Sequence, residues 1–272
     1  MYQIQCELNL SLNMENSLIT VVTICYNAAN ILENTILSVI NQTYSKIEYI
    51  IIDGLSTDST MEIVNKYKDR ISKILSEPDK GIYDAMNKGI KLATGDWIIF
   101  LNAGDQFVNN EIITDFCRQI EPSTIIAYGN ANLIYKSMTV LWKTFPLNTL
   151  KNRMCFCHQS TFVNTIYHKK HLFDISYKIS GDYNFFYEAY YKNQIKFQYI
   201  PLTVVNYEAE NGMSAKNYFV RLKEDARLKG IKNDFYFKIK YLSLVVLYYI
   251  KLFFRFFMPQ KILNYRRKKI FN

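Results

Sequence analysis

The chain has 272 residues, of which 33 are Lys or Arg and 24 are Asp or Glu, so that its formal net charge is +9. This length accommodates one large domain or two smaller ones, and an apolar content of 49% indicates a globular protein and excludes a disordered one. The five cysteines show no paired spacing, which favours free thiols in a reducing compartment over a disulfide framework. Because no basic start followed by an apolar run opens the chain, we expect no signal peptide.

Short apolar runs alternate with helical patterns in the first part of the chain. Asn30 is expected to cap the first helix, and Ser59 with Glu62 has the spacing of a capping box for the second. Such alternation requires right-handed crossovers and a parallel sheet with helices on both faces, so we predict the α/β class. The expected strands are 18–25, 47–52, 71–75 and 97–101, and the expected helices are 31–42, a helix after Asp58 and 82–93.

Polar residues follow three of these expected strands. Tyr26 and Asn27 come after the first strand, Asp53 ends the second, and Asp105 lies just beyond the fourth. Because ligands of open α/β sheets bind beyond the carboxyl ends of the strands, we expect one cleft lined by carboxylates. The chain has no Gly-x-Gly-x-x-Gly and no Walker sequence, which argues against a dinucleotide dehydrogenase or a P-loop NTPase.

Three ordered motifs carry a resemblance to a known family. They are Val-Thr-Ile-Cys-Tyr-Asn at 22–27, Tyr-Ile-Ile-Ile-Asp-Gly-Leu-Ser-Thr-Asp at 49–58 and Gly-Asp-Trp-Ile-Ile-Phe-Leu-Asn-Ala-Gly-Asp at 95–105. Together they resemble the family 2 glycosyltransferases of the non-processive, polysaccharide or lipopolysaccharide biosynthesis type. The likeness extends more loosely through 157–162 and 179–186 to about Ser214. It implies the GT-A fold, in which helices flank a Rossmann-like, mostly parallel central sheet.

The resemblance also implies roles for individual residues. Asp53 matches the residue that contacts the nucleotide base, and Asp105 matches the last Asp of the Asp-x-Asp signature, which holds a divalent metal on the donor diphosphate. Asp182 matches the family's general base. The sequence departs from the family at Gly104, where other members often have Asp, and at Gly181, where they have Glu. The further residues assigned to the nucleotide sugar are Thr23, Tyr26, Asn27, Asp79, Asn87 and Asn102, of which Asn102 also stands where Asp is frequent.

The chemistry of sugar transfer fits these residues. A bound Mg²⁺ or Mn²⁺ neutralises the leaving diphosphate, and Mg²⁺ commonly uses only one or two protein carboxylates, so that Asp105 alone suffices in principle. An acceptor hydroxyl must lose its proton, and a partly buried Asp182 is suited to take it. The alternatives are structural: Asp53 and Asp105 as residues of strand-end turns, and Asp182 as a helix cap.

Several other residues are weaker candidates. His158 and Gln159, in a Cys-His-Gln-Ser segment, and Ser214 are predicted to contact the acceptor or a phosphate. The segment from Glu210 to Ser214 is predicted to be either a loop that closes over the nucleotide-sugar donor or an ordinary surface loop. His168 and its neighbour at 171 lie in a Lys-rich segment, which predicts solvated side chains.

The positive charge is concentrated at the end of the chain. Nine basic residues and no acidic residue follow Asp234, so the rest of the chain is neutral. The uncharged run 241–250 is too short for a span of about 20 residues. We expect residues 236–272 to lie on an anionic membrane surface; the alternative is a helix pair packed on the body or in a homodimer. The long aliphatic run argues against nucleic acid as a partner.

The sequence thus predicts an inverting glycosyltransferase of the hexosyl or N-acetylhexosaminyl type, located in the cytoplasm at the membrane face. It would use a nucleotide diphosphate donor, most simply a UDP-sugar, and a glycan or lipid-linked acceptor. The expected regions are a nucleotide-sugar-binding half at 17–110, an acceptor-binding half at 111–215 and a basic amphipathic helical tail at 216–272. Two other classes remain open: a non-catalytic nucleotide-sugar-binding protein and a nucleotidyltransferase, although the first strand lacks the basic glycine-rich loop of the latter.

Overall fold

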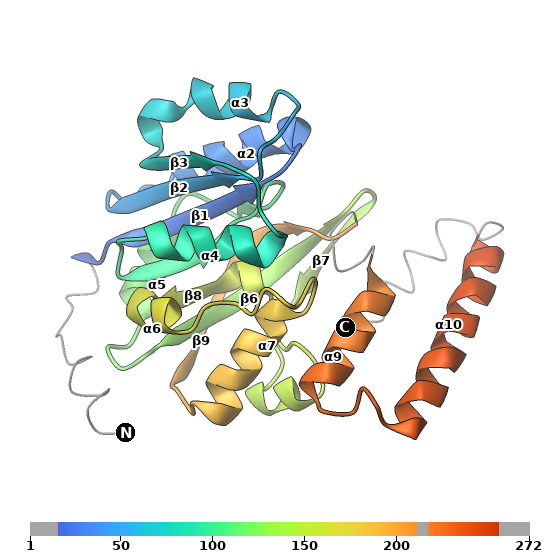
Figure 1. Ribbon diagram of the computed structural model, residues 1–272. Coiled ribbons are helices and arrows are strands. Elements are labelled where there is room, and N and C mark those ends of the chain that lie inside the picture. The colour runs from blue at the N-terminus through green and yellow to red at the C-terminus, as the bar shows by residue number, and fades with distance from the viewer. Residues whose placement is uncertain (1–15, 211–216, 256–272) are drawn as a thin grey trace.

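The structure is a computed structural model that describes residues 16–210 and 217–255 (Figure 1). Its strands are β1 (Ile19–Cys25), β2 (Ile47–Asp53), β3 (Lys73–Ser76), β4 (Trp97–Phe100), β5 (Gln106–Phe107), β6 (Ile126–Tyr135), β7 (Met138–Trp142), β8 (Thr161–Asn164) and β9 (Phe197–Glu208). Its α-helices are α2 (Ala29–Ile40), α3 (Thr60–Lys66), α4 (Ile82–Leu92), α5 (Ile112–Gln119), α6 (Thr165–Lys170), α7 (Gly181–Tyr187), α9 (Tyr218–Leu228) and α10 (Phe235–Arg255). A short 3₁₀ turn at His158–Ser160 precedes β8.

All strands belong to one sheet, ordered β3-β2-β1-β4-β8-β6-β9-β5, with β7 paired to β6. The pairs β1 with β2, β1 with β4 and β2 with β3 are parallel, as the alternation of strands and helices predicts. Beyond β4 the sheet is mixed, because β8 runs antiparallel to β4 and β6, whereas β9 runs parallel to β6. The predicted α/β class with a flanked, mostly parallel central sheet is confirmed.

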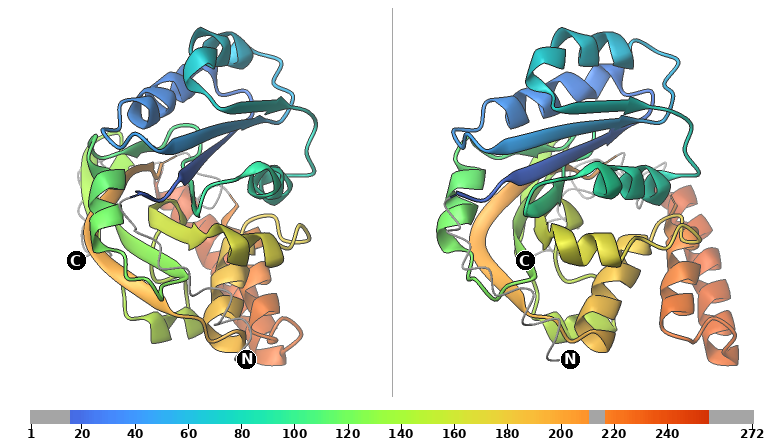
Figure 2. Two further views of the ribbon diagram at one scale, coloured as in Figure 1. Left: turned by 90° about the vertical axis from the view of Figure 1, so that its left-hand side faces the viewer. Right: turned by 60° about the vertical axis from the view of Figure 1, so that its left-hand side comes forward.

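Helices cover both faces of the sheet and create two hydrophobic cores (Figure 2). Successive side chains of a strand point to opposite faces, so Val21 joins the core under α2, α3 and α5, while Val22 joins the core under α4 and α7. The same alternation separates Ile51 from Ile52 in β2 and Ile99 from Ile98 in β4. Because β1, β2 and β4 are buried on both faces, their sequences are largely apolar, and the one charged residue inside them is Glu48 of β2.

The starts of α2 and α3 differ from the prediction. Asn30 does not cap α2; the backbone amides of Ala28 and Ala29 instead donate to the side chains of Thr60 (2.8 Å) and Asp58 (3.2 Å). Ser59 makes no side-chain cap bond, and Asp58 accepts the amide of Thr60 at 3.0 Å. The caps of α2 therefore come from a loop about 30 residues further along the chain, which local spacing cannot reveal.

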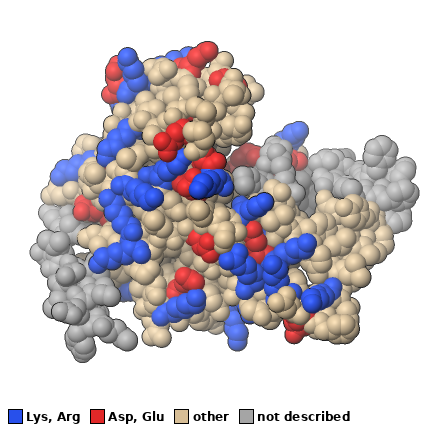
Figure 3. Space-filling view, viewed as in Figure 1, with Lys and Arg blue, Asp and Glu red and all other residues tan. Residues whose placement is uncertain are grey.

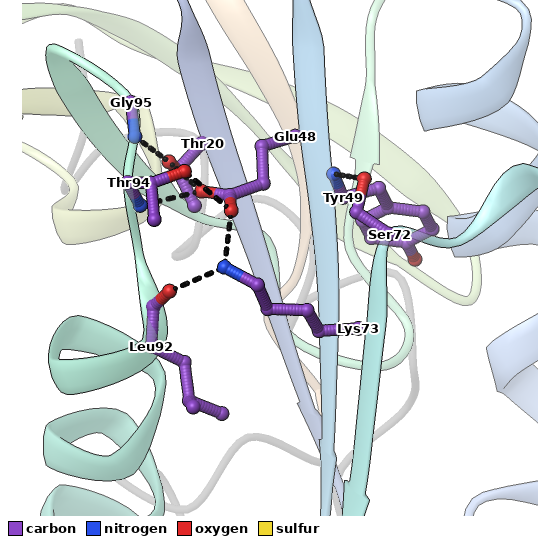
Figure 4. A network of polar contacts seen from close by, with 8 residues as sticks. All are labelled: Thr20, Glu48, Tyr49, Ser72, Lys73, Leu92, Thr94 and Gly95. Carbon is purple, nitrogen blue, oxygen red and sulfur yellow. Dashed lines mark hydrogen bonds and ion pairs between the residues drawn. The ribbon is translucent and has the colours of Figure 1, made fainter.

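A buried carboxylate, Glu48, connects neighbouring strands near the amino end of β2 (Figure 4). Glu48 Oε2 accepts hydrogen bonds from the Thr20 hydroxyl and the Thr94 amide, both at 2.7 Å, while Oε1 accepts from Lys73 Nζ at 2.6 Å and from the Thr94 hydroxyl at 2.7 Å. Burial alone would raise the pKa of Glu48, but the bonds from Lys73, Thr94 and Thr20 outweigh it and lower this pKa to about 2. Glu48 thus connects β1, β2, β3 and the turn before β4.

We expect Glu48→Gln to lower the free energy of unfolding by about 2–4 kcal/mol, which corresponds to about 5–10 °C in Tm. Both carboxylate oxygens of Glu48 face donors, so the new amide group must meet at least one of them. Thermal unfolding of this variant is compared with that of Glu62→Gln, a change at an exposed position that should alter Tm little.

The contribution of Glu48 to stability depends on pH. Because the folded-state pKa of Glu48 is depressed, this contribution is present above the ordinary pKa near 4.5 and is lost as the pH falls towards 2. Equal Tm values for the two variants would contradict this role.

The two C-terminal helices lie side by side, away from the sheet (Figure 1). Phe219 of α9 makes edge-to-face ring contacts with Tyr241 and Tyr248 of α10, with ring centres 5.9 and 4.9 Å apart. Glu224 of α9 joins this pair to the body, because its carboxylate accepts the backbone amides of residues 178–180. No helix in the described part of the chain is long and apolar enough to cross a membrane.

Candidate active site

The adjacent ends of β1 and β2 bring three predicted site residues together. Cys25 and Asp53 are paired in register, so Tyr26 and Asn27 leave the sheet beside Asp53. Asp53 is fully buried, and its carboxylate accepts bonds from the Ser56 amide at 3.0 Å, the Ser76 hydroxyl at 2.7 Å and the Ser56 hydroxyl. Asp53 therefore organises the turn that follows β2.

Tyr26 and Asp79 flank the same glycine at this edge. A Cβ atom on Gly54 would lie 2.6 Å from Asp79 Oδ2 and 3.3 Å from Tyr26 Cδ2, so no larger residue fits there without displacing them. Tyr26 is 63% exposed and can offer its ring to a planar ligand. Asn27 has a positive φ of 47° and accepts the Thr57 amide at 2.8 Å, which fixes the backbone next to that ring.

Thr23 and Asn87, which were predicted to contact the nucleotide sugar, both have buried side chains in the core. The Thr23 hydroxyl, fully buried, shares a hydrogen bond of 3.0 Å with the Tyr49 hydroxyl. The amide of Asn87 donates to the carbonyl of Phe173 and accepts its N–H, each at 2.9 Å, and so joins α4 to the segment before α7. The structure does not bring Thr23 or Asn87 to the exposed surface around Tyr26.

Asp105 lies in the turn that follows β4. Its own amide donates to the carbonyl of Asn102 at 2.9 Å, and the amide of Glu208, at the end of β9, donates to Asp105 Oδ1 at 3.0 Å. Asp105 is 4% exposed, and burial raises its pKa to about 8; the Glu208 amide lowers this pKa and the Glu208 charge raises it. A buried carboxylate of this kind is ionised most readily beside a cation.

The backbone of this turn explains one departure from the family pattern. Gly104 has a φ of +99°, a conformation that an aspartate would adopt only with strain. Its amide donates to the Thr35 hydroxyl of α2 at 2.9 Å, which holds the turn against the helix. The side chains that can offer oxygen atoms in this turn are therefore those of Asn102 and Asp105, whereas residue 104 has no side chain.

The residues of this turn fit a divalent metal. Within the described residues, Asn102 Oδ1 is a buried acceptor without a hydrogen-bond partner, three positions before the buried Asp105. Oxygen donors from amides and carboxylates suit Mg²⁺ and Mn²⁺. The described part of the chain contains no group of three His, Cys, Asp or Glu side chains arranged for a metal, so a substrate diphosphate and water would have to complete the coordination.

Asp182 lies in the first turn of α7, and its two carboxylate oxygens have different surroundings. Oδ1 accepts the amide of Tyr183 at 2.8 Å and lies 3.0 Å from the Tyr83 hydroxyl, which also contacts the carbonyl of Ile179 at 2.6 Å. Oδ2 lies 3.9 Å from His158 Nδ1, too far for a hydrogen bond. Burial raises the pKa of Asp182, although the bonds from Tyr183 and Tyr83 lower it.

Packing explains the glycine that precedes this residue. A Cβ atom on Gly181 would lie 2.7 Å from the ring of Tyr83, which is itself 4% exposed. Any side chain at 181, including the glutamate that the family often has there, would push away the hydroxyl that contacts Asp182. Tyr83 therefore occupies the space that the missing glutamate would need.

Asp105 and Asp182 lie in one region although 77 positions separate them in the sequence. Burial raises the pKa of Tyr207, and the charges of Cys157, Asp105, Asp182 and Glu208 raise it further. Burial likewise raises the pKa of Cys157, to which the charges of Asp105 and Asp182 add. The charges of both carboxylates thus act on Tyr207 and Cys157, and His158, the residue after Cys157, lies 3.9 Å from Asp182.

The histidines are less available than the sequence suggests. His158 is 6% exposed among the rings of three phenylalanines, and burial lowers its pKa to about 4, so that it is neutral at pH 7. Gln159 accepts the thiol of Cys157 at 3.2 Å. His168, predicted to be solvated, is completely buried and stacks on Phe185 with ring centres 4.5 Å apart. The prediction is wrong for His168, because the basic residues beside it point outward from α6 while His168 points inward. It is confirmed for His171, which is exposed. Ser214 lies outside the described residues.

Tyr83 and Glu208 contact the candidate residues Asp182 and Asp105, and neither was expected from the sequence. Tyr83 lies in the Gly-Ile-Tyr-Asp segment beside Asp79, so the position of that loop is the signal that points to it. Glu208 is at the end of β9, 103 positions after Asp105. Nothing in its local sequence links it to Asp105, because only the pairing of β5 with β9 brings the two together.

Two curated relatives match long stretches of this chain. The PGL/p-HBAD biosynthesis glycosyltransferase of Mycobacterium bovis is 30% identical over 223 residues, which cover 76% of this chain and 84% of the relative. The UDP-Glc:alpha-D-GlcNAc-diphosphoundecaprenol beta-1,3-glucosyltransferase WfaP of Escherichia coli is 35% identical over 114 residues, covering 42% of this chain and 45% of that protein.

Two solved structures share the fold. S. aureus TarS in complex with UDP-GlcNAc superposes with a TM-score of 0.63 at 16% identity, covering 77% of this chain and 66% of that chain. The mannosyltransferase PcManGT of Pyrobaculum calidifontis, in complex with GDP-Man and Mn²⁺, superposes with a TM-score of 0.58 at 16% identity, covering 76% of this chain and 61% of that chain. This chain therefore spans just under two thirds of each. The family model for Glycosyl transferase family 2 matches residues 20–181, more than half of the sequence. The chain belongs to glycosyl transferase family 2, and it is a glycosyltransferase with a GT-A-like fold.

Proposed function

We propose that this protein transfers a sugar from a UDP-sugar to a hydroxyl group of a lipid-linked glycan, with inversion at the anomeric carbon. The observation that carries the proposal is the state of the Asp182 carboxylate: Oδ1 is held by α7 and Tyr83, Oδ2 lies too far from His158 for a hydrogen bond, and the side chain is 25% exposed. UDP as donor is supported by the names of WfaP and of the TarS complex. A lipid-linked acceptor is supported by the name of WfaP alone.

Asp182 acts as the general base in this proposal. The acceptor hydroxyl gives its proton to Asp182 Oδ2 while its oxygen bonds to the anomeric carbon of the donor. The bond from that carbon to the diphosphate oxygen breaks, and the electron pair leaves with UDP. The proton on Asp182 then passes to solvent. Attack opposite the leaving group inverts the anomeric carbon, so no enzyme nucleophile is needed. Tyr83 orients the carboxylate by its contact with Oδ1.

Asp105 and Asn102 would hold the divalent metal, Mg²⁺ or Mn²⁺. When bound, the metal supplies Lewis-acid stabilisation of the charge that develops on the diphosphate. The structure of PcManGT, which has a similar fold, is a complex with GDP-Man and Mn²⁺, which supports a metal in this chain as well. At the neighbouring edge, the exposed ring of Tyr26 would take the base, with Asp79 beside it and with Asn27 and Asp53 fixing the turn.

A donor panel tests the proposed function. The full chain is heated with UDP- and GDP-linked sugars, each with and without Mg²⁺ or Mn²⁺, and the donor that raises Tm most is then tested for turnover. We expect a UDP-sugar to stabilise the protein in a metal-dependent way and to be consumed when a glycan acceptor is added. The absence of any metal-dependent shift with every donor would overturn the proposal. Donor binding without turnover on any acceptor would instead support a non-catalytic binding role.

We also propose that α10 attaches the enzyme to an anionic membrane surface. Five apolar residues at helical spacing form a stripe along α10, and each is more than half exposed. Figure 3 shows that the visible face of α10 carries few charges. No acidic residue follows Asp234, so every charge from the start of α10 onward is positive and attracts anionic lipid. The stripe residues are Phe235, Ile239, Leu242, Val246 and Tyr249.

Leu242→Glu combined with Tyr249→Glu should reduce binding to phosphatidylcholine–phosphatidylglycerol vesicles by at least about tenfold, because two apolar side chains can no longer enter the lipid. Co-sedimentation of the full chain measures this effect. Ser243→Glu is the matched control, since it adds a charge to the same helix outside the stripe. Unchanged sedimentation of the double variant, together with a change from dimer to monomer, would show that the stripe binds a second copy and would contradict the membrane proposal.

A further inference from the structure

A cavity of about 290 Å³ lies between α9 and the segment that precedes α7. Four basic side chains line it: Lys178 from the segment before α7, Lys223 and Arg227 from α9, and Lys232 from the loop that follows α9. In the view of Figure 3, blue side chains gather over α9 and this segment. The cavity is distinct from the surface around Tyr26 at which we place the donor.

The one acidic residue of the lining forms no ion pair with these cations among the described residues, and its single charge leaves the lining net positive. Glu224 directs its carboxylate at the backbone, where Oε1 accepts the amide of Lys178 at 2.7 Å and Oε2 accepts the amides of Ile179 and Ser180, each at 2.9 Å. Its lone pairs are thus largely engaged by neutral donors. Among the lining cations only Arg227 has an acidic partner in the described residues, at 3.5 Å from Asp174.

The remaining cations are available to a ligand. Within the part of the chain that the structure describes, Lys178, Lys223 and Lys232 form no ion pair, and all three are exposed. Arg227 is held in place by a 2.8 Å bond to the Ser176 hydroxyl and by the ring of Tyr177, 4.4 Å below it. Several cations of this kind around one hollow suit a phosphate or diphosphate ester, since each can donate to its oxygens.

The position of the cavity connects it to the catalytic residues. Lys178 is four residues before Asp182, at most about 14 Å along the chain. A second cavity of about 200 Å³ shares Lys178 and is also lined by Tyr83, the residue whose hydroxyl contacts Asp182. The two cavities therefore meet at Lys178, and the second borders the tyrosine that contacts the proposed base. On the other side, Lys223 lies over the ring of Tyr241, at 5.1 Å, so the cationic cavity also borders α10.

We infer that this cavity binds the diphosphate of the lipid that carries the acceptor sugar. A sugar bound next to Asp182 would then have its diphosphate at Lys178, Lys223, Arg227 and Lys232, and its lipid chain at the apolar stripe of α10. This inference rests on the proposed function for the identity of the ligand. The positive charge of the cavity by itself indicates only that the ligand is a phosphate ester, and the headgroup of a phospholipid is one as well.

The test compares two double variants of the full chain that lose the same charge. Lys178→Gln with Lys232→Gln removes two cavity cations that make no ion pair, whereas Lys91→Gln with Lys169→Gln removes two exposed lysines elsewhere. Binding of farnesyl diphosphate is measured in EDTA, so that a metal at Asp105 does not contribute. We expect the cavity variant to bind at least about tenfold more weakly than wild type, and the control within about twofold.

Two further measurements identify the source of the phosphate. Sedimentation with phosphatidylcholine vesicles, with and without phosphatidylglycerol, should be the same for both double variants if the cavity takes the acceptor diphosphate. A selective loss of sedimentation by the cavity variant, with farnesyl diphosphate binding unchanged, would assign the cavity to phospholipid headgroups and overturn the inference. Equal farnesyl diphosphate binding by both variants would overturn it as well. Stabilisation by UDP-sugar and metal tests the proposed function separately and should be the same in both.

Discussion

Asp182→Asn is expected to lower the transfer rate by about 10²- to 10⁴-fold while leaving the affinity for the donor unchanged. Asparagine has nearly the same shape, and its oxygen can still accept the Tyr183 amide and the Tyr83 hydroxyl. It cannot take a proton from the acceptor. The measurement is the initial rate of sugar transfer together with the stabilisation by donor and metal. Asp69→Asn, at an exposed position, is the control and should retain full activity.

The same variant should be at least as stable as the wild type at neutral pH. Burial raises the folded-state pKa of Asp182 above its ordinary value near 3.8, so folding favours the protonated form. The contribution of this form is present at low pH and is lost as the pH rises through the raised pKa. Asparagine, always neutral, avoids this loss. Transfer by the wild type should show the opposite trend and increase with pH through the same pKa, because the base must be ionised.

These two readouts separate a base from a merely structural aspartate. If Asp182 only accepted hydrogen bonds at the start of α7, Asp182→Asn would keep them and leave the transfer rate unchanged. Retained transfer with unchanged pH dependence would exclude Asp182 as the base. A rate that falls together with Tm and with donor affinity would indicate that the variant had disturbed the fold around Tyr83.

The first half of the fold could be predicted because its signals are local. Strands β1, β2 and β4 are buried on both faces, so each is largely apolar, and the polar residues after them mark the edge at which the candidate site lies. The mixed half of the sheet could not be predicted in the same way. The antiparallel pairing of β8 with β4 depends on contacts between distant segments, which no local spacing encodes.

The candidate site shows the same limit residue by residue. The motifs pointed to Asp105, Asp182 and Tyr26 as candidates, and these stay predictions. The motifs did not indicate that the side chains of Thr23 and Asn87 make hydrogen bonds inside the core. The glycines at 104 and 181 seemed to weaken the family pattern. The structure gives each a physical reason, a positive φ at Gly104 and the ring of Tyr83 against Gly181. The partner of Asp105, Glu208, comes from the far end of β9 and had no signal in the sequence.

Asp105→Asn is expected to abolish the metal-dependent part of donor stabilisation and to lower kcat/KM by at least about 100-fold, since the metal is worth several kcal/mol of transition-state stabilisation. Donor binding without metal should change little, because Tyr26 and Asp79 lie at a different strand end. The measurement is the Tm shift produced by the best donor from the panel, with and without Mn²⁺. Asp115→Asn, on the outer side of α5, is the charge-matched control.

A second variant tests the metal site without disturbing the fold. Asn102→Ala removes a buried oxygen that has no hydrogen-bond partner within the described residues, so it breaks no bond that stabilises the turn. We expect its Tm without ligand to match the wild type within about 2 °C, and its Mn²⁺ requirement to rise by about tenfold. A variant that needs no more Mn²⁺ than the wild type would remove Asn102 from the metal site. If Asp105→Asn also kept a full metal-dependent shift, the metal would have to be bound by other groups, and the turn after β4 would be structural.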